Sequence, residues 1–203
     1  MGVYDRLIVP RLLDLAMRNR LLDRYRQRAI ETARGLVLEV GVGSGVNLPL
    51  YGGAVTRVVG LDPSSELLRL ASRRAADVVA PVSLLRASAE HLPLAEAVFD
   101  AIVMTWTLCS IPNAIAALTE MRRVLRPGGR LIFVEHDLSP EIRTARWQHW
   151  LTPYWKRISG GCHLNRKTDD LIRAAGFQID AVETGYMTGP KPWTFMYQGS
   201  ATS

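Results

Sequence analysis

The chain has 203 residues, of which 48% are hydrophobic and 22% are charged, and its formal net charge is +6. This length corresponds to about one domain with a sizeable core, so we expect a single domain over residues 1–203. The composition excludes a disordered chain, a collagen and a coiled coil. No run of 18 or more apolar residues occurs and residues 1–6 show no signal-peptide pattern, so no membrane-spanning helix is expected.

The basic charge is concentrated in the two flanks of the chain. Residues 1–34 carry eight arginines against four acidic residues, and residues 141–203 carry eight basic against five acidic residues, whereas residues 35–140 are slightly acidic. Basic flanks can bind nucleic acid or an anionic membrane surface, or they can simply keep the protein soluble. The two cysteines, Cys109 and Cys162, are too few for a disulfide framework, which favours free thiols and a cytoplasmic protein.

Apolar runs alternate with helical patterns along the chain. Such continuous apolar runs are typical of strands buried on both faces of a sheet. The alternation of strands and helices predicts an α/β fold with a doubly wound, mostly parallel sheet. Strands are expected over residues 35–40, 55–61, 82–85, 98–105, 130–135, 178–182 and 191–198, and helices over 113–125 and from Pro63 and Thr168.

Three polar features follow three consecutive predicted strands. Residues 39–45 read Glu-Val-Gly-Val-Gly-Ser-Gly, a spacing that matches neither the dinucleotide-binding pattern nor the P-loop. Asp62 ends the second strand, where an acid can accept hydrogen bonds from both hydroxyls of a ribose. Residues 87–93 form the loop after the third strand. Because parallel strands end at one edge of the sheet, these features are expected to form one ligand site there.

These motifs resemble those of class I S-adenosylmethionine-dependent methyltransferases. Residues 39–45 are similar to motif I of that family, Asp62 to its ribose-binding acid, and residues 88–93 to its adenine-side loop; residues 99–103 and 123–129 extend the resemblance over 35–140. Ser88 departs from the aspartate that the family often has. The resemblance implies a seven-stranded Rossmann-like sheet, S-adenosyl-L-methionine as cofactor and S-adenosyl-L-homocysteine as product. The cofactor-binding residues that it implies are Glu39, Gly41, Gly43, Gly45, Asn47, Asp62, Pro63, Ser88, Ala89, Glu90 and Thr105.

A narrower resemblance reaches further toward the C-terminus. Residues 43–47, 107–110, 135–136 and 155–166 look like the methyltransferase-like thiol methyltransferases of membranes, and the domain is also similar to the ubiquinone and phospholipid methyltransferase type. This resemblance implies that a small lipophilic thiol or amine accepts the methyl group, and that residues 141–203 form the acceptor side of the protein.

The catalytic residues are harder to predict. His136 follows the fifth strand and can act as a general base near neutral pH, and Asp137 stands beside it. Cys162 and His163 have no partner pair at ligand spacing, so no metal site is expected. Trp106 is expected beside Thr105 at the methyl end of the cofactor. A dense aromatic set fits core packing, an apolar acceptor pocket or a membrane-interface belt, and it comprises Trp147, Trp150, Tyr154, Trp155 and Trp193.

Alternative functions stay open at this level. The same cofactor site could serve a phosphatidylethanolamine N-methyltransferase on the inner face of the membrane, with an interfacial anchor formed by Leu7, Ile8, Leu12, Leu15 and Ala16. A helical lid over residues 1–34 that covers the cofactor explains the same stripe. A catalytically silent nucleic-acid-binding protein is disfavoured by the slightly acidic middle of the chain. We expect a monomer.

Overall fold

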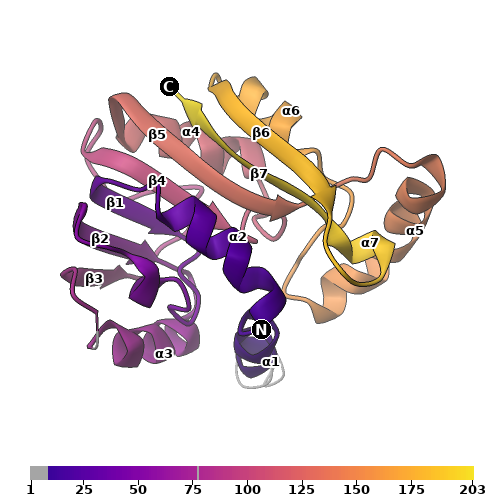
Figure 1. Cartoon of the computed structure of the whole chain (residues 1–203), viewed down its shortest axis with the longest axis horizontal. Coiled ribbons are helices and arrows are strands. Elements are labelled where there is room, and N and C mark those ends of the chain that lie inside the picture. The colour runs from indigo at the N-terminus through magenta and orange to yellow at the C-terminus, as the bar shows by residue number, and fades with distance from the viewer. Residues whose placement is uncertain (1–8, 77) are drawn as a thin grey trace.

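The apolar runs form one seven-stranded sheet in the computed structural model, which describes residues 9–76 and 78–203. The strand order is β3-β2-β1-β4-β5-β7-β6 (Figure 1). Strands β1 to β5 pair in parallel, whereas β7 runs antiparallel to both β5 and β6. The prediction of a doubly wound, mostly parallel sheet is therefore confirmed. The strands are β1 (Gly35–Val40), β2 (Val55–Leu61), β3 (Val82–Leu85), β4 (Phe99–Thr105), β5 (Leu125–His136), β6 (Gln178–Tyr186) and β7 (Phe195–Thr202).

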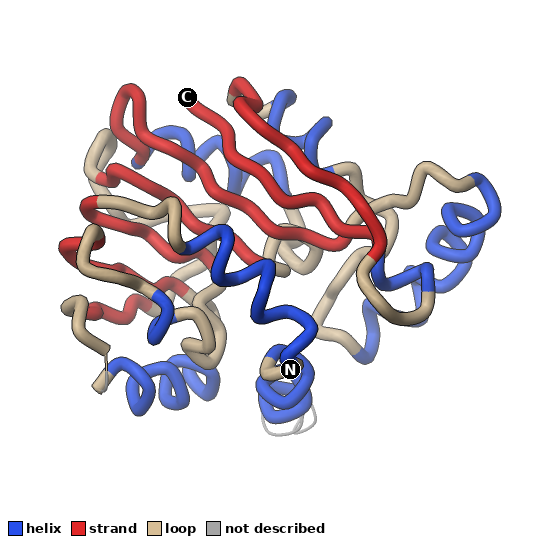
Figure 2. Tube along the Cα trace, in the orientation of Figure 1, coloured by secondary structure: helices blue, strands red, loops and turns tan. Residues whose placement is uncertain are grey.

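Helices cover both faces of the sheet, so the central strands β1 and β4 are buried from two sides (Figure 2). In β1, Val37 faces a core that α2 completes, and Leu38 faces the opposite core that α4 completes. Both side chains are fully buried, as expected for a parallel sheet between two helical layers. The helices are α1 (Val9–Met17), α2 (Arg20–Ile30), α3 (Ser65–Ala75), α4 (Ala114–Val124), α5 (Ile142–Ile158), α6 (Thr168–Ala174), α7 (Lys191–Thr194) and the 3₁₀ helix η2 (Leu48–Leu50).

Local capping explains where the central helices begin. The Ser64 side chain accepts a hydrogen bond from the backbone N–H of Leu67 at the start of α3. Asn113 accepts one from the N–H of Ala116 at the start of α4. Both residue types are strongly preferred N-caps because their side chains satisfy a free N–H of the first turn. These caps fix the helices so that the preceding loops stay at the carboxyl edge of the sheet.

The structure departs from the predicted elements in three places. Residues 191–194 form the short helix α7, so the predicted strand over 191–198 begins only at Phe195; Pro192 lacks an N–H and suits a first helical turn better than a strand. The glycine loop after β1 leads into a single turn, η2, that was not among the predicted helices, and Asn47 precedes this turn without a capping hydrogen bond from its side chain. Residues 142–158, where only an aromatic set was recognised, form the longest helix, α5, at the right of Figure 1.

Candidate cofactor and acceptor site

A cavity of about 450 Å³ lies at the carboxyl ends of the parallel strands. This is where open α/β sheets bind ligands, beside the point at which β1 separates β2 from β4. The cavity is covered by α1 through Leu13, Ala16 and Met17, and is flanked by Trp155 of α5 and Trp193 of α7. The predicted features after β1, β2 and β3 therefore meet in one place. Leu7 and Ile8 of the predicted N-terminal stripe lie outside the described residues.

The three glycines after β1 have different roles. Gly41 and Gly43 line the cavity with positive φ angles of 71° and 54°. A Cβ at Gly41 would lie 2.3 Å from the Thr107 side chain, whereas a Cβ at Gly43 would meet nothing closer than 3.9 Å, so Gly43 leaves room for a ligand. Gly45 does not line the cavity; it allows close packing, because a Cβ there would lie 2.8 Å from Leu48.

Glu39 is buried at the end of β1 and lines the cavity. Its Oε1 accepts a hydrogen bond from Asn47 Nδ2 at 2.8 Å and its Oε2 accepts one from the Tyr51 hydroxyl at 2.9 Å. Asn47 Nδ2 also donates to Thr105 Oγ1 at 3.0 Å, and Asn47 Oδ1 is buried with no hydrogen-bond partner among the described residues. Burial raises the pKa of Glu39 to about 7. The arrangement offers free acceptor oxygens to a cationic ligand group.

Asp62 follows β2 and faces the same cavity, next to Pro63. Its Oδ2 accepts the N–H of Gly43 at 3.0 Å and its Oδ1 accepts the N–H of Ser64 at 2.8 Å. Burial raises the pKa of this carboxyl. Because each carboxylate oxygen has more than one lone pair, Asp62 can still accept hydrogen bonds from two ligand hydroxyls.

Two of the three residues predicted on the adenine-side loop line the cavity. Ser88 and Ala89 do so, but Glu90 does not. The Glu90 carboxylate accepts the N–H of Asn113 at 2.8 Å and the Ser88 hydroxyl at 3.0 Å. Glu90 therefore ties this loop to the start of α4.

Arg26 of α2 is a cavity residue that the sequence reasoning missed. It is buried, its Nη2 donates to the Met17 carbonyl at 2.9 Å, and its guanidinium carbon lies 4.7 Å from the centre of the Trp106 ring. Nε and Nη1 are buried without a partner in the part of the chain that the structure describes, and burial lowers the pKa of Arg26 to about 10. Its position on the apolar stripe with Leu22, Ala29 and Ile30 was a signal available in the sequence.

The cavity is also lined by Cys109, His136 and Cys162, where we expect the methyl acceptor to lie. His136 Nε2 lies 3.0 Å from Cys162 Sγ. A hydrogen bond from the Cys109 thiol, together with the neighbouring His136, lowers the pKa of Cys162 to about 4, and the same thiol contact raises the pKa of Cys109 well above its ordinary value. Burial alone would lower the pKa of His136, but the neighbouring Cys162 sulfur raises it above its ordinary value. Both shifts favour a thiolate on Cys162 and a proton on His136.

Asp137 does not line the cavity. Its carboxylate accepts the N–H of Leu138 at 2.7 Å and the N–H of Thr168 at 2.6 Å, at the start of α6. Burial raises the pKa of Asp137 to about 7. Asp137 is the first residue after β5, and its carboxylate is taken up by these two N–H groups, whereas His136 lines the cavity. The structure thus gives Asp137 a position at a helix start and leaves His136 at the cavity.

A family model described as a methyltransferase domain matches residues 38–133. Thiol S-methyltransferase TMT1B of Homo sapiens is 34% identical over 194 residues, which cover 86% of this chain and 75% of that protein. The protein of the same name from Rattus norvegicus is 34% identical over 161 residues, covering 77% of this chain and 65% of that protein. Phosphatidylethanolamine N-methyltransferase of Cereibacter sphaeroides is 39% identical over 116 residues, covering 56% of this chain and 57% of that protein.

Solved structures share the fold at lower identity. The cyclase SpnF superposes with a TM-score of 0.77 at 19% identity, covering 98% of this chain and 94% of that one. A methyltransferase from Thermotoga maritima superposes with a TM-score of 0.69 at 24% identity, covering 96% of this chain and 98% of that one. The chain spans 65% to 75% of the length of the two thiol methyltransferase relatives. From the identity to the human relative and the matching domain model, the chain belongs to the S-adenosylmethionine-dependent methyltransferases.

Proposed function

We propose that the protein transfers the methyl group of S-adenosylmethionine to a small lipophilic thiol or amine. The observation that carries this proposal is one cavity with two buried carboxylates at one end and an apolar, aromatic and thiol-lined region at the other. The polar end suits the charged and hydroxylated parts of the cofactor. The apolar end suits an uncharged organic methyl acceptor.

The residues at the polar end fit the cofactor group by group. Glu39 and the unpartnered Asn47 Oδ1 would receive the amino group, and the unpartnered N–H groups of Arg26 would receive the carboxylate. Asp62 would accept the ribose hydroxyls, and Ser88 and Ala89 would adjoin the adenine. In this arrangement a protein carboxylate would accept charge-assisted hydrogen bonds from the amino group of the cofactor, and a guanidinium would donate them to its carboxylate.

The bound cofactor supplies an electrophilic methyl group on a sulfonium centre, so the protein needs no covalent nucleophile of its own. The contribution of this chain is orientation and the exclusion of water. Thr105 is held by Asn47 at the tip of β4, and Trp106 adopts a positive φ of 50°, a conformation that a bulky residue rarely takes. Together with α1 above the cavity, these side chains form the walls between the two ends.

A thiol acceptor is supported by the relatives, two of which are named thiol S-methyltransferases. A thiol that lies in the cavity without contact to a metal reacts as its thiolate, so its turnover should climb with pH toward the ordinary thiol pKa of about 8.5. An amine acceptor must also lose a proton, and the His136–Cys162 pair lies at the cavity as the candidate group to receive it.

The test is a screen for methyl acceptors that measures S-adenosylhomocysteine release. Small lipophilic thiols, amines, phenols and phosphatidylethanolamine vesicles are compared at equal concentration. We expect turnover with thiols or amines. Robust methylation of the vesicles, with no turnover of any small thiol or amine, would overturn the proposal.

Phospholipid N-methylation at a membrane surface is the second candidate, favoured by an exposed apolar ridge on α5. Along α5, the ring centres of Trp147 and Trp150 lie 5.5 Å apart, and those of Trp150 and Tyr154 lie 5.7 Å apart. No helix of residues 9–76 and 78–203 has the length and apolar character needed to cross a bilayer. The ridge consists of Ile142, Trp147, Trp150, Tyr154 and Ile158, each more than half exposed.

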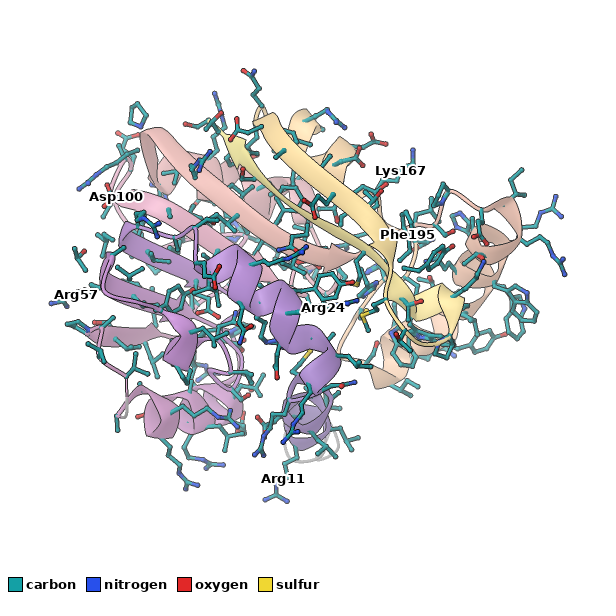
Figure 3. All side chains as sticks on the ribbon, in the orientation of Figure 1. Arg11, Arg24, Arg57, Asp100, Lys167 and Phe195 are labelled. Carbon is teal, nitrogen blue, oxygen red and sulfur yellow. The ribbon has the colours of Figure 1, made fainter. Side chains whose placement is uncertain are left out.

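The C-terminal end of α5 lies near the cavity, which Trp155, Ser159 and Gly160 line. A Cβ at Gly160 would lie 3.5 Å from Leu13, so the end of α5 and α1 are neighbours. On α1, Leu12 and Leu15 are exposed, and Arg11 points away from the protein (Figure 3). Tryptophan, tyrosine and flanking basic residues are the side chains that favour a membrane interface. This arrangement would let a lipophilic acceptor enter from an anionic membrane surface, whichever acceptor is used.

A further inference from the structure

Three metal-ligating side chains from distant parts of the chain converge at the acceptor end of the cavity. The ligand atoms of Cys109, His136 and Cys162 all lie within 4.8 Å of one another. Cys109 follows β4, His136 ends β5 and Cys162 follows α5. All three residues line the cavity, so the space between them opens toward the methyl acceptor. No local spacing along the chain indicates this cluster, because the three residues lie on separate elements.

The loops that carry the two cysteines are pinned to each other and to β5. The carbonyl of Cys109 accepts hydrogen bonds from the backbone N–H of His163 at 2.8 Å and from His163 Nδ1 at 3.0 Å. The buried Glu135 carboxylate accepts the N–H groups of Thr107 at 2.7 Å and Leu108 at 2.8 Å. The cluster is therefore held by main-chain contacts that do not depend on its own side chains, as a preorganised metal site requires.

The turn before Cys162 shows the same constraint. Gly160 and Gly161 have φ angles of 65° and 93°, which residues other than glycine rarely adopt. A Cβ at Gly161 would also lie 3.3 Å from the carbonyl of Ser110, so the turn approaches the Cys109 loop closely. These two glycines bring Cys162 to the position where its sulfur meets His136.

We propose that Cys109, His136 and Cys162 bind one zinc ion whose fourth coordination position opens into the acceptor cavity. Two thiolates and one imidazole suit zinc, and three protein ligands with one open position are the arrangement of catalytic zinc sites. Zinc bond lengths of about 2.0–2.3 Å with tetrahedral angles require ligand atoms about 3.6–3.8 Å apart. His136 Nε2 and Cys162 Sγ lie 3.0 Å apart and no pair of ligand atoms is more than 4.8 Å apart, so small side-chain rotations would bring them to that geometry.

The ion gives the cluster a role in methyl transfer, a role that rests on the proposed thiol acceptor. A thiol that takes the fourth position displaces water and releases its proton to solvent, because a metal-bound thiol is deprotonated outright. The acceptor would then be held as a thiolate at the acceptor end of the cavity. Coordination would also occupy the lone pairs of Cys109 and Cys162, two nucleophiles that otherwise face an electrophilic methyl group.

The test measures metal binding directly, without turnover. Full-length protein is reduced, stripped with a chelator and titrated with Zn²⁺ against a chromophoric competitor, and separately with Co²⁺ as an optical substitute for zinc. We expect one equivalent of each ion to bind, and the cobalt protein to show thiolate-to-metal charge-transfer absorption and the strong visible bands of tetrahedral cobalt. Less than half an equivalent of Zn²⁺, or a cobalt spectrum without charge transfer, overturns the proposal.

Variants assign the ligands. Cys109→Ser, Cys162→Ser and His136→Gln should each weaken Zn²⁺ binding by more than about 100-fold, beyond the loss caused by removing an outer partner of a metal site. His149→Gln is the matched control, because His149 is exposed and bonded to Asn165 away from the cavity. Circular dichroism checks that each variant is folded. Zn²⁺ affinity unchanged in both cysteine variants contradicts the assignment.

Two further outcomes separate this inference from the proposed function. An intramolecular disulfide between Cys109 and Cys162, found by mass spectrometry in protein that binds no Zn²⁺ after reduction, would make the cluster a redox pair and would overturn the metal site. Stoichiometric zinc in a protein that methylates amines but no thiol supports the metal site and contradicts the thiol acceptor. Addition of a small thiol should alter the cobalt charge-transfer bands, whereas an amine of the same shape should not.

Discussion

The two ends of the cavity are built in different ways. At the cofactor end, Glu39, Gly43, Asn47 and Asp62 come from one stretch of chain and are joined by direct hydrogen bonds. At the acceptor end, Cys109, His136 and Cys162 come from three separate elements and are brought together by main-chain contacts between loops. These contacts at the cofactor end therefore depend on local geometry. The acceptor end depends on tertiary packing, and we expect the methyl acceptor to be selected there.

The largest effect on this comparison is expected from Asp62→Ala. Asp62 would accept two charge-assisted hydrogen bonds from the ribose, each contributing roughly 1.5–3 kcal/mol. The loss of both bonds, about 3–6 kcal/mol, should therefore lower the affinity for S-adenosylhomocysteine by about 10²–10⁴-fold in calorimetry. The exposed Asp170, which lies on α6, provides the control Asp170→Ala. Equal affinity in both variants would contradict the assignment of Asp62.

Arg26→Met separates the two parts of the cofactor end, with an expected loss of about tenfold for S-adenosylhomocysteine. Methylthioadenosine lacks the amino acid group, so its affinity should be unchanged in this variant, whereas Asp62→Ala should weaken both ligands. Calorimetry with the two ligands gives the comparison. If Arg26→Met weakened both ligands equally, Arg26 would support the cavity wall beside Trp106 and would not bind the carboxylate.

The sequence allowed most of the fold and much of the cofactor end to be predicted. Apolar runs and glycine turns are short-range signals, and they located β1 to β5 and the acids at the ends of β1 and β2. Arg26 was missed because a buried arginine on an apolar stripe looks like one of many basic residues in the N-terminal flank. The cluster of Cys109, His136 and Cys162 was missed because no local spacing encodes it. The α7 turn was missed because the apolar pattern of 191–198 outweighed the proline signal.

Glu39→Gln tests the cost of burying an acid at the cofactor end. Burial raises the pKa of Glu39 to about 7 in the folded chain, above its value in the unfolded chain, with Tyr51 and Arg26 as the titratable neighbours. The folded state therefore holds the proton more tightly, and the contribution of Glu39 to stability falls as the pH rises from about 4.5 to about 7. Above that range ionised Glu39 destabilises the cofactor-free protein by up to about 3 kcal/mol.

The expected result is a difference that depends on pH. Urea unfolding should give similar stability for the wild type and Glu39→Gln at about pH 5, and a more stable variant by about 1–3 kcal/mol at about pH 8.5. The same variant should bind S-adenosylhomocysteine more weakly, because a neutral amide replaces the carboxylate that faces the amino group. A variant that is less stable than the wild type at both pH values would show that Glu39 is retained for packing.

The smallest effect concerns the acceptor end and its surroundings. Basic residues near an anionic membrane contribute about 1 kcal/mol each, and this attraction is screened by salt, whereas exposed tryptophans contribute through apolar burial. Trp150→Ser should therefore reduce flotation with anionic vesicles a few-fold and leave thermal stability almost unchanged, because Trp150 is 59% exposed.

Val79→Ser is the matched control for the α5 ridge. Val79 is 94% exposed in the segment that precedes β3, at the amino edge of the sheet and away from the cavity. The Val79→Ser substitution removes an exposed apolar side chain and leaves α1 and α5 unchanged, so flotation should not change. Raising the salt concentration should release both the wild type and this control from the vesicles.

Flotation that is equally strong in neutral vesicles and at high salt, or equal in Trp150→Ser and the wild type, would mean that the ridge contacts something other than an anionic bilayer. The acceptor end would then be supplied from solution, and the difference between the two ends of the cavity would lie only in the side chains that line them.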